Sequence, residues 1–270
     1  MNSRLLDHKI PTQRDTRLEF LRRHTAHLPF FDRYQSGDCE AVWNELQGLG
    51  PYVREDPYAA DALAVAYETM TRARANIETI ARRLQQMDYQ FYSWNKPVAE
   101  PVLRRPAESE WPQILSIEEE TGPLPLSFRA WLAMGGQVEL TGVHPRLSFI
   151  SGASRERSPL ERDLIFTDPI VIYGVEDASK CFESVGSVGF SDCQSAKANY
   201  EGGDPYTLMM HTAGADCLVH GFLNVVYKIT FVQYLRRAFA WGGFPGFAEP
   251  KWARYRPSEL DVLREGLQLL

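Results

Sequence analysis

Apolar residues recur every three or four positions across residues 61–88, and this is the clearest pattern in the chain. Residues spaced in this way share one face of an α-helix. The stripe consists of Leu63, Ala66, Met70, Ala73, Ile77, Ile80, Leu84 and Met87. It predicts a long amphipathic helix, with Asp61 as the residue that caps its first turn.

A shorter stripe with the same period predicts another helix upstream. Its apolar residues are Cys39, Val42, Trp43, Leu46 and Leu49. We expect Asp38 to cap the start of this helix, because aspartate is a favoured residue at that position. Gly48, Gly50 and Pro51 are expected to end it.

The long helix has two interpretations. Its stripe packs on the Trp43 helix within the same chain, or it forms a coiled-coil seam between two copies of the chain. Alanine at positions 66 and 73 weakens a free-standing coiled coil, so we favour packing within the chain. We expect the protein to be a monomer or a homodimer.

Prolines are dense between Trp94 and Pro112. Each proline lacks a backbone N–H and biases the preceding residue to extended geometry, so no regular helix can cross this segment. Such a segment is typical of a domain boundary. We therefore predict a helical N-terminal region at 1–92, a proline-rich linker at 93–112 and an α+β domain with a C-terminal helix at 113–270.

Two short helices are predicted directly after this linker. The first covers residues 114–121 and ends at Gly122, since glycine suits the position that follows a helix. Pro125 is well placed to open the second helix. The apolar residues of the second helix and the glycines that end it are Phe128, Trp131, Leu132, Gly135 and Gly136.

Short apolar runs typical of β-strands occupy the middle of this domain. They lie at 138–140, 147–150, 164–166, 170–173, 206–210 and 217–219. A helix with Phe231, Leu235 and Phe239 on one face follows, and a last helix begins near Ser258. Helices, then mainly strands, then helices favour an α+β fold over alternating βαβ units.

The chain has 270 residues and a formal net charge of −6, and most of the acidity lies after residue 100. A nucleic-acid-binding domain usually presents a basic face. No basic run is visible in this sequence, so we expect no direct nucleic-acid contact. An acidic surface suits a basic protein partner, and it also simply keeps a protein soluble.

No apolar run approaches the roughly 18 residues that a transmembrane helix needs. The start of the chain lacks the apolar core of a signal peptide. We therefore expect no membrane contact and a cytoplasmic location. The four cysteines, Cys39, Cys181, Cys193 and Cys217, form no CxxC pair and are expected to be free thiols in a reducing compartment.

No catalytic or cofactor-binding motif stands out. GxxxxGK[ST] and GxGxxG are absent, and residues 186–189 are one residue short of a GxSxG elbow. Cys217 and His220 would point to opposite faces of a strand, which favours a core thiol and a surface imidazole over a zinc site. We predict no catalytic residue, no cofactor, no metal and no enzymatic activity; a hydrolase with scattered residues is the least favoured hypothesis.

Three groups of residues resemble the SUKH superfamily, the fold shared by a yeast cell-wall-synthesis regulator and many bacterial toxin-immunity proteins. The opening group is Ile117, Glu118, Gly122, Leu124, Pro125, Phe128, Trp131, Leu132, Gly135 and Gly136. The middle group is Gly202, Gly203, Asp204, Pro205, Tyr206 and Leu208. The closing group is Phe231, Tyr234, Leu235 and Phe239. The similarity covers about residues 110–247 and leaves the N-terminal helical region outside.

This resemblance implies a twisted, mainly antiparallel sheet with flanking helices and a non-catalytic, protein-binding function. The favoured hypothesis is an immunity-type protein that binds and neutralises a cognate bacterial toxin domain. The alternative is a scaffold or regulatory protein that dimerises through the helix at 61–88.

Six residues are candidates for contact with the partner. They are Gly203, Asp204, Tyr206, Trp241, Phe244 and Phe247. Aromatic side chains exposed on a stiff turn make effective binding anchors. The other interpretation of the turn at 241–247, which we prefer, is that its aromatic residues cap the core below the closing helix.

Overall fold

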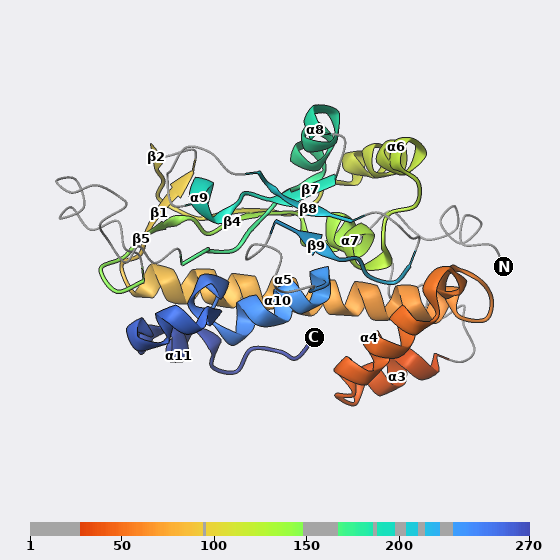
Figure 1. Cartoon of the computed structure of the whole chain (residues 1–270), viewed down its shortest axis with the longest axis horizontal. Coiled ribbons are helices and arrows are strands. Elements are labelled where there is room, and N and C mark those ends of the chain that lie inside the picture. The colour runs from red at the N-terminus through yellow and green to blue at the C-terminus, as the bar shows by residue number, and fades with distance from the viewer. Residues whose placement is uncertain are drawn as a thin grey trace.

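The computed structural model describes residues 28–93, 96–147, 167–185, 188–197, 204–209, 214–221 and 229–270. Helices and small antiparallel sheets are both present, which confirms the predicted α+β class. Helices α6 and α8 lie on one side of the strands, and α5 runs lengthwise on the other side, with α3, α4 and α11 beyond it (Figure 1).

The described helices are as follows. The α-helices are α3 (Pro29–Gln35), α4 (Cys39–Gly48), α5 (Ala59–Gln86), α6 (Trp111–Thr121), α7 (Leu126–Ala130), α8 (Val175–Val185), α9 (Gln194–Lys197), α10 (Phe231–Ala240) and α11 (Glu259–Arg264). The 3₁₀-helices are η1 (Gly50–Arg54), η2 (Glu108–Glu110), η6 (Pro245–Ala248) and η7 (Pro250–Tyr255). The element η3 (Trp131–Gly135) is a π-helix.

The described strands form three antiparallel sheets with the orders β2-β1-β5, β3-β4-β6 and β7-β8-β9. Their bounds are β1 (Gln90–Ser93), β2 (Lys96–Pro97), β3 (Val102–Arg104), β4 (Gln137–Glu139), β5 (Gly142–Val143), β6 (Val171–Ile172), β7 (Val188–Ser191), β8 (Tyr206–Leu208) and β9 (Val219–His220). Residues 148–150 of the predicted run at 147–150, and the whole predicted run at 164–166, lie outside the described residues.

Backbone hydrogen bonds connect these three sheets. The amide of Tyr173, just after β6, donates to the carbonyl of Phe190 in β7 at 2.8 Å. The amide of Tyr92 in β1 donates to the carbonyl of Thr141, between β4 and β5, at 2.9 Å. The three antiparallel sheets therefore form one broken layer, to which β1 and β2 add an edge.

Helix α5 is buried along most of its length. Every residue of the predicted stripe that lies inside the helix has at most 5% of its surface exposed. The stripe packs on elements of the same chain, mainly α3, α7, η3 and α11. The apolar face that a dimer seam along residues 61–88 would need therefore lies inside the core of the chain.

Buried polar side chains on α5 hold the segments around it. Asp61 accepts hydrogen bonds from the first amides of α3, those of Phe30 and Phe31, at 2.8 and 2.9 Å. It was predicted to cap its own helix, but α5 begins at Ala59 and Asp61 caps α3 instead. Thr69 accepts a bond from the indole of Trp43 in α4 at 3.1 Å.

Arg74 of α5 ties the helix to the second half of the chain. Its guanidinium donates to the carbonyl of Gly135 at 2.7 Å and to that of Leu103 in β3 at 2.8 Å. Only 2% of Arg74 is exposed. Burial of a charged group is expensive without such partners, so these bonds fix η3 and β3 against α5.

The proline-rich segment at 93–112 is part of the fold rather than a free linker. It contains β2, β3 and η2, and β3 pairs with β4. The buried apolar residues on both sides of this segment belong to one contiguous core. The described residues before and after the predicted boundary therefore share their interior.

Two glycines of the opening motif have nearly the same backbone but different surroundings. Gly122 has φ 84° and ψ 175°, and Gly136 has φ 74° and ψ −162°. A Cβ atom at Gly122 would meet nothing within 4 Å, whereas one at Gly136 would collide with the carbonyl oxygen of Arg104 and with Pro106.

This pair gives a matched test of packing. We expect Gly122→Ala to lower the free energy of unfolding by about 1–3 kcal/mol, the usual cost of a side chain in this backbone region. Gly136→Ala should cost clearly more, because β3 must also move. Urea unfolding of both variants measures the difference, and equal losses would contradict the described contact between Gly136 and β3.

Candidate functional site

The opening and closing motifs of the chain meet in one aromatic cluster. The ring of Phe231 in α10 lies edge-on to Phe128 of α7, Trp131 of η3 and Phe190 of β7, with centroids 5.5, 6.3 and 5.4 Å away. Tyr234, one turn along α10, packs on Phe190 at 5.2 Å. Edge-to-face packing of this kind stabilises a core beyond simple burial.

Asp216 joins the same two motifs through hydrogen bonds. Its carboxylate accepts from the hydroxyl of Ser127 in α7 at 2.6 Å and from the amide of Val232, in the first turn of α10, at 3.1 Å. Burial raises the pKa of Asp216, and these bonds oppose the rise. The carboxylate serves as a second cap for α10, beside the capping box of Thr230 and Gln233.

Glu118 holds the Leu-Pro turn between α6 and α7. Its two carboxylate oxygens accept from the amide of Leu124 and from the guanidinium of Arg129, both at 3.1 Å. Arg129 is buried and stacks on the ring of Trp111 at 4.9 Å. Of the three consecutive glutamates at 118–120, only Glu119 and Glu120 are exposed.

Three of the six candidate contact residues are core residues. Tyr206, Phe244 and Phe247 are each 1% exposed. Phe244 packs on the ring of Tyr89, 6.0 Å away. Burial prevents these side chains from touching a partner while the fold is intact, so they are not exposed anchors and cap the core instead.

The remaining candidates have different positions. Trp241 is partly buried, and the guanidinium carbon of Arg256 lies 5.2 Å from its ring centroid. Asp204, two residues before β8, is exposed. Gly203 lies outside the described residues. Of the six, Asp204 is accessible and Trp241 is partly so. The structure does not bring the six together as one exposed surface.

A buried ion pair lies beside Tyr206, and nothing in the sequence pointed to it. The ammonium of Lys197 in α9 donates to the carboxylate of Asp168 at 2.8 Å, and both side chains are fully buried. The same ammonium lies 4.9 Å from the ring centroid of Tyr206. Burial raises the pKa of Asp168, while the charge of Lys197 opposes the rise.

This cluster anchors the chain rather than reacting with a substrate. Asp168 precedes β6, Lys197 ends α9 and Tyr206 begins β8, so the pair fixes three segments that are distant in sequence. Neither charged group reaches the surface. A catalytic lysine or carboxylate must touch its substrate, which these side chains cannot do in this structure.

Cys217 and His220 have the environments expected from the strand pattern. Cys217 is buried and burial raises the pKa of its thiol well above the ordinary value, while His220 is exposed on β9. Within the described ranges, no three His, Cys, Asp or Glu residues are arranged to hold a metal ion. The thiol is therefore poorly suited to act as a nucleophile.

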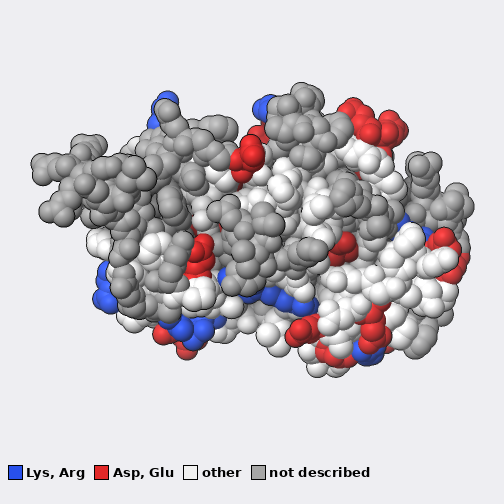
Figure 2. Space-filling model, in the orientation of Figure 1, with Lys and Arg blue, Asp and Glu red and all other residues white. Residues whose placement is uncertain are grey.

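The clearest surface feature is acidic. Red side chains gather at the upper right of the molecule, over the position of α6 (Figure 2). Glu108 in η2 and Glu119 and Glu120 in α6 are exposed. In the described part of the chain, no lysine or arginine forms an ion pair with these three carboxylates. We call Glu108, Glu119 and Glu120 the acidic face.

Comparisons with protein-family models, with curated proteins and with solved structures find no match to this chain. The SUKH resemblance is thus carried by its residues alone. Of the helices in the described ranges, none combines the length and the apolar content that a bilayer crossing requires.

The buried pair gives a test of its anchoring role. We expect Lys197→Met or Asp168→Asn alone to lower the free energy of unfolding by about 3–5 kcal/mol, because each leaves the other group buried without its partner. The double variant should lose clearly less than the sum of the two. Urea unfolding measures all three variants.

Lys180→Met supplies the matched control, since it breaks the exposed pair with Glu176 in α8. Exposed pairs contribute little, so the control should unfold like the unmodified protein. Single substitutions at the buried pair that behave like this control would show that Asp168 and Lys197 are not paired in solution.

Proposed function

We propose that the chain is a non-catalytic protein-binding module of the immunity type, which binds a cognate toxin domain and blocks it. The observation that supports this most is the aromatic cluster of Phe128, Trp131, Phe190 and Phe231, because it brings together residues of the opening and closing groups of the SUKH resemblance. These groups are about 100 residues apart in sequence.

The acidic face is the surface that we assign to the partner. Exposed carboxylates that form no ion pair within the described residues create a negative potential that attracts a basic protein and speeds its association. Toxin domains that act on nucleic acids carry basic surfaces for their substrates. An acidic module that covers such a surface would compete with the substrate.

Burial of the long stripe removes the support for the scaffold alternative. A dimer that formed through α5 would have to expose residues that are now in the core, such as Met70 and Ile77. The loss of their burial would cost several kcal/mol of folding free energy. We therefore propose one binding module rather than a dimerising scaffold.

Charge reversal tests the assigned surface. Glu119→Lys together with Glu120→Lys should weaken binding to a basic toxin domain that co-purifies with the unmodified chain by about tenfold or more, mainly through a slower association rate. The salt dependence of the association rate should also fall. Surface plasmon resonance at two ionic strengths measures both effects.

Asp32→Lys together with Glu40→Lys is the control, because both residues are exposed on α3 and α4, beyond α5 from the acidic face (Figure 1), and the net charge changes equally. If the two double variants bind alike, the acidic face is not the contact surface. If no toxin domain co-purifies with the unmodified chain, the immunity function itself is contradicted.

A further inference from the structure

The last described residues turn back along α5. Gly266, with φ 62°, turns the chain after α11, and residues 265–270, which we call the return segment, then run beside α5 in the opposite direction (Figure 1). Arg83 of α5 bonds the carbonyl of Glu265, and Asn76, two turns earlier in the helix, bonds Gln268.

The hydrogen bonds to this segment go to its backbone. Asn76 donates to the carbonyl of Gln268 at 2.9 Å and accepts from its amide at 2.8 Å. Arg72 donates to the carbonyl of Leu269 at 3.3 Å, and Arg236 of α10 donates to that of Leu270 at 2.8 Å. Backbone pairing of this kind binds extended peptides with little regard to sequence.

Only two side chains of the segment enter the protein. Leu270 is 5% exposed and Leu267 packs partly against the core, whereas Leu269 is 70% exposed and Gln268 is also exposed. A peptide that fits this groove therefore needs two leucines three positions apart, and any residue can occupy the two positions between them.

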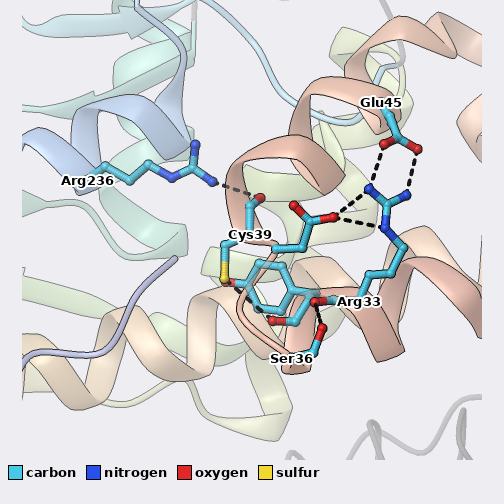
Figure 3. A network of polar contacts seen from close by, with 7 residues as sticks. Arg33, Ser36, Cys39, Glu45 and Arg236 are labelled. Atoms are coloured by element: carbon cyan, nitrogen blue, oxygen red, sulfur yellow. Dashed lines mark hydrogen bonds and ion pairs between the residues drawn. The ribbon is translucent and has the colours of Figure 1, made fainter.

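The donors of the groove are held by other parts of the fold. Arg236 also donates to the carbonyl of Cys39 at the start of α4, at 3.1 Å (Figure 3). Arg72 pairs with Glu68 at 2.9 Å and stacks 4.7 Å from the ring centroid of Tyr34. Such contacts do not depend on the return segment, so the groove is preorganised for an extended chain.

We propose that the groove formed by Arg72, Asn76, Arg83 and Arg236 is a peptide-binding site, which takes an extended partner segment with the pattern Leu-x-x-Leu. The return segment is its resident occupant and regulates access to it. A tethered occupant acts at an effective concentration on the order of millimolar, so a partner segment binds strongly only after displacement. This goes beyond the immunity function and does not rest on the acidic face.

The experiment compares the full chain with a variant that ends after Glu265. The probe is a fluorescein-labelled peptide with the sequence of residues 264–270, capped at both ends so that they carry no charge. By fluorescence anisotropy we expect saturable binding to the shortened chain below about 1 mM, and binding to the full chain at least about tenfold weaker.

Two matched pairs identify the groove. Asn76→Ala in the shortened chain should weaken binding by about tenfold, since it removes two hydrogen bonds to the peptide backbone, while Gln85→Ala, exposed on the same helix, should have no effect. In the peptide, Leu270→Ala should weaken binding strongly and Leu269→Ala should leave it unchanged.

If the shortened chain does not fold, the experiment uses a full chain with a protease site inserted between Glu265 and Gly266. After folding and cleavage, the cut residues 266–270 should exchange with the labelled peptide. Three results would each overturn the proposal. The full and shortened chains bind the peptide equally, or neither the shortened nor the cleaved chain binds it saturably, or the two leucine substitutions have equal effects.

Discussion

A single buried helix determines the arrangement of this protein. Helix α5 packs with other elements around most of its circumference. Its buried polar side chains, those of Asp61, Thr69, Arg74 and Asn76, are accommodated because each bonds a neighbouring segment. Asp61 caps α3, Thr69 binds the indole of Trp43, and Arg74 bonds carbonyls near β3 and β4. Because an unpaired buried polar group is costly, these bonds specify which segment lies where along the helix. The order of elements around α5 follows from them.

The two proposed binding surfaces follow from this arrangement. Since α5 and the sheet bury the aromatic residues of both motifs, these residues cannot contact a partner. The proposed partner contacts are therefore made by the carboxylates on η2 and α6 and by the groove along α5. The first is defined by charge and the second by backbone hydrogen bonds with two leucine side chains. They lie on opposite sides of the strand layer, since α6 covers one side and α5 the other (Figure 1). A partner that binds at one surface therefore leaves the other accessible.

The elements that the sequence predicted are those with local signals. The stripe at 61–88, the Gly122 stop and the stripe of Phe231, Leu235 and Phe239 all depend on neighbours within a few residues, and the structure contains the corresponding helices. Strands β1 to β3 were missed because they are short, and because β1 and β3 are stabilised by the distant partners β5 and β4. Helix α8 was missed as well. The pair of Asp168 and Lys197 joins residues 29 apart with no shared motif, and the ring contact of Phe244 joins it to the distant Tyr89. Tertiary contacts of this kind leave no periodic trace in a sequence.

The account depends on α5 being the shared interior of the regions before and after the proline-rich segment. Amide hydrogen exchange followed by mass spectrometry tests this directly, since it reports the opening free energy of each segment in the native protein. We predict that peptides from the middle of α5, from α7 and from α10 exchange only through global unfolding, with the same free energy and the same dependence on denaturant. A helix α5 that opens at clearly lower free energy than α7 and α10 would show a separate N-terminal unit and contradict the account.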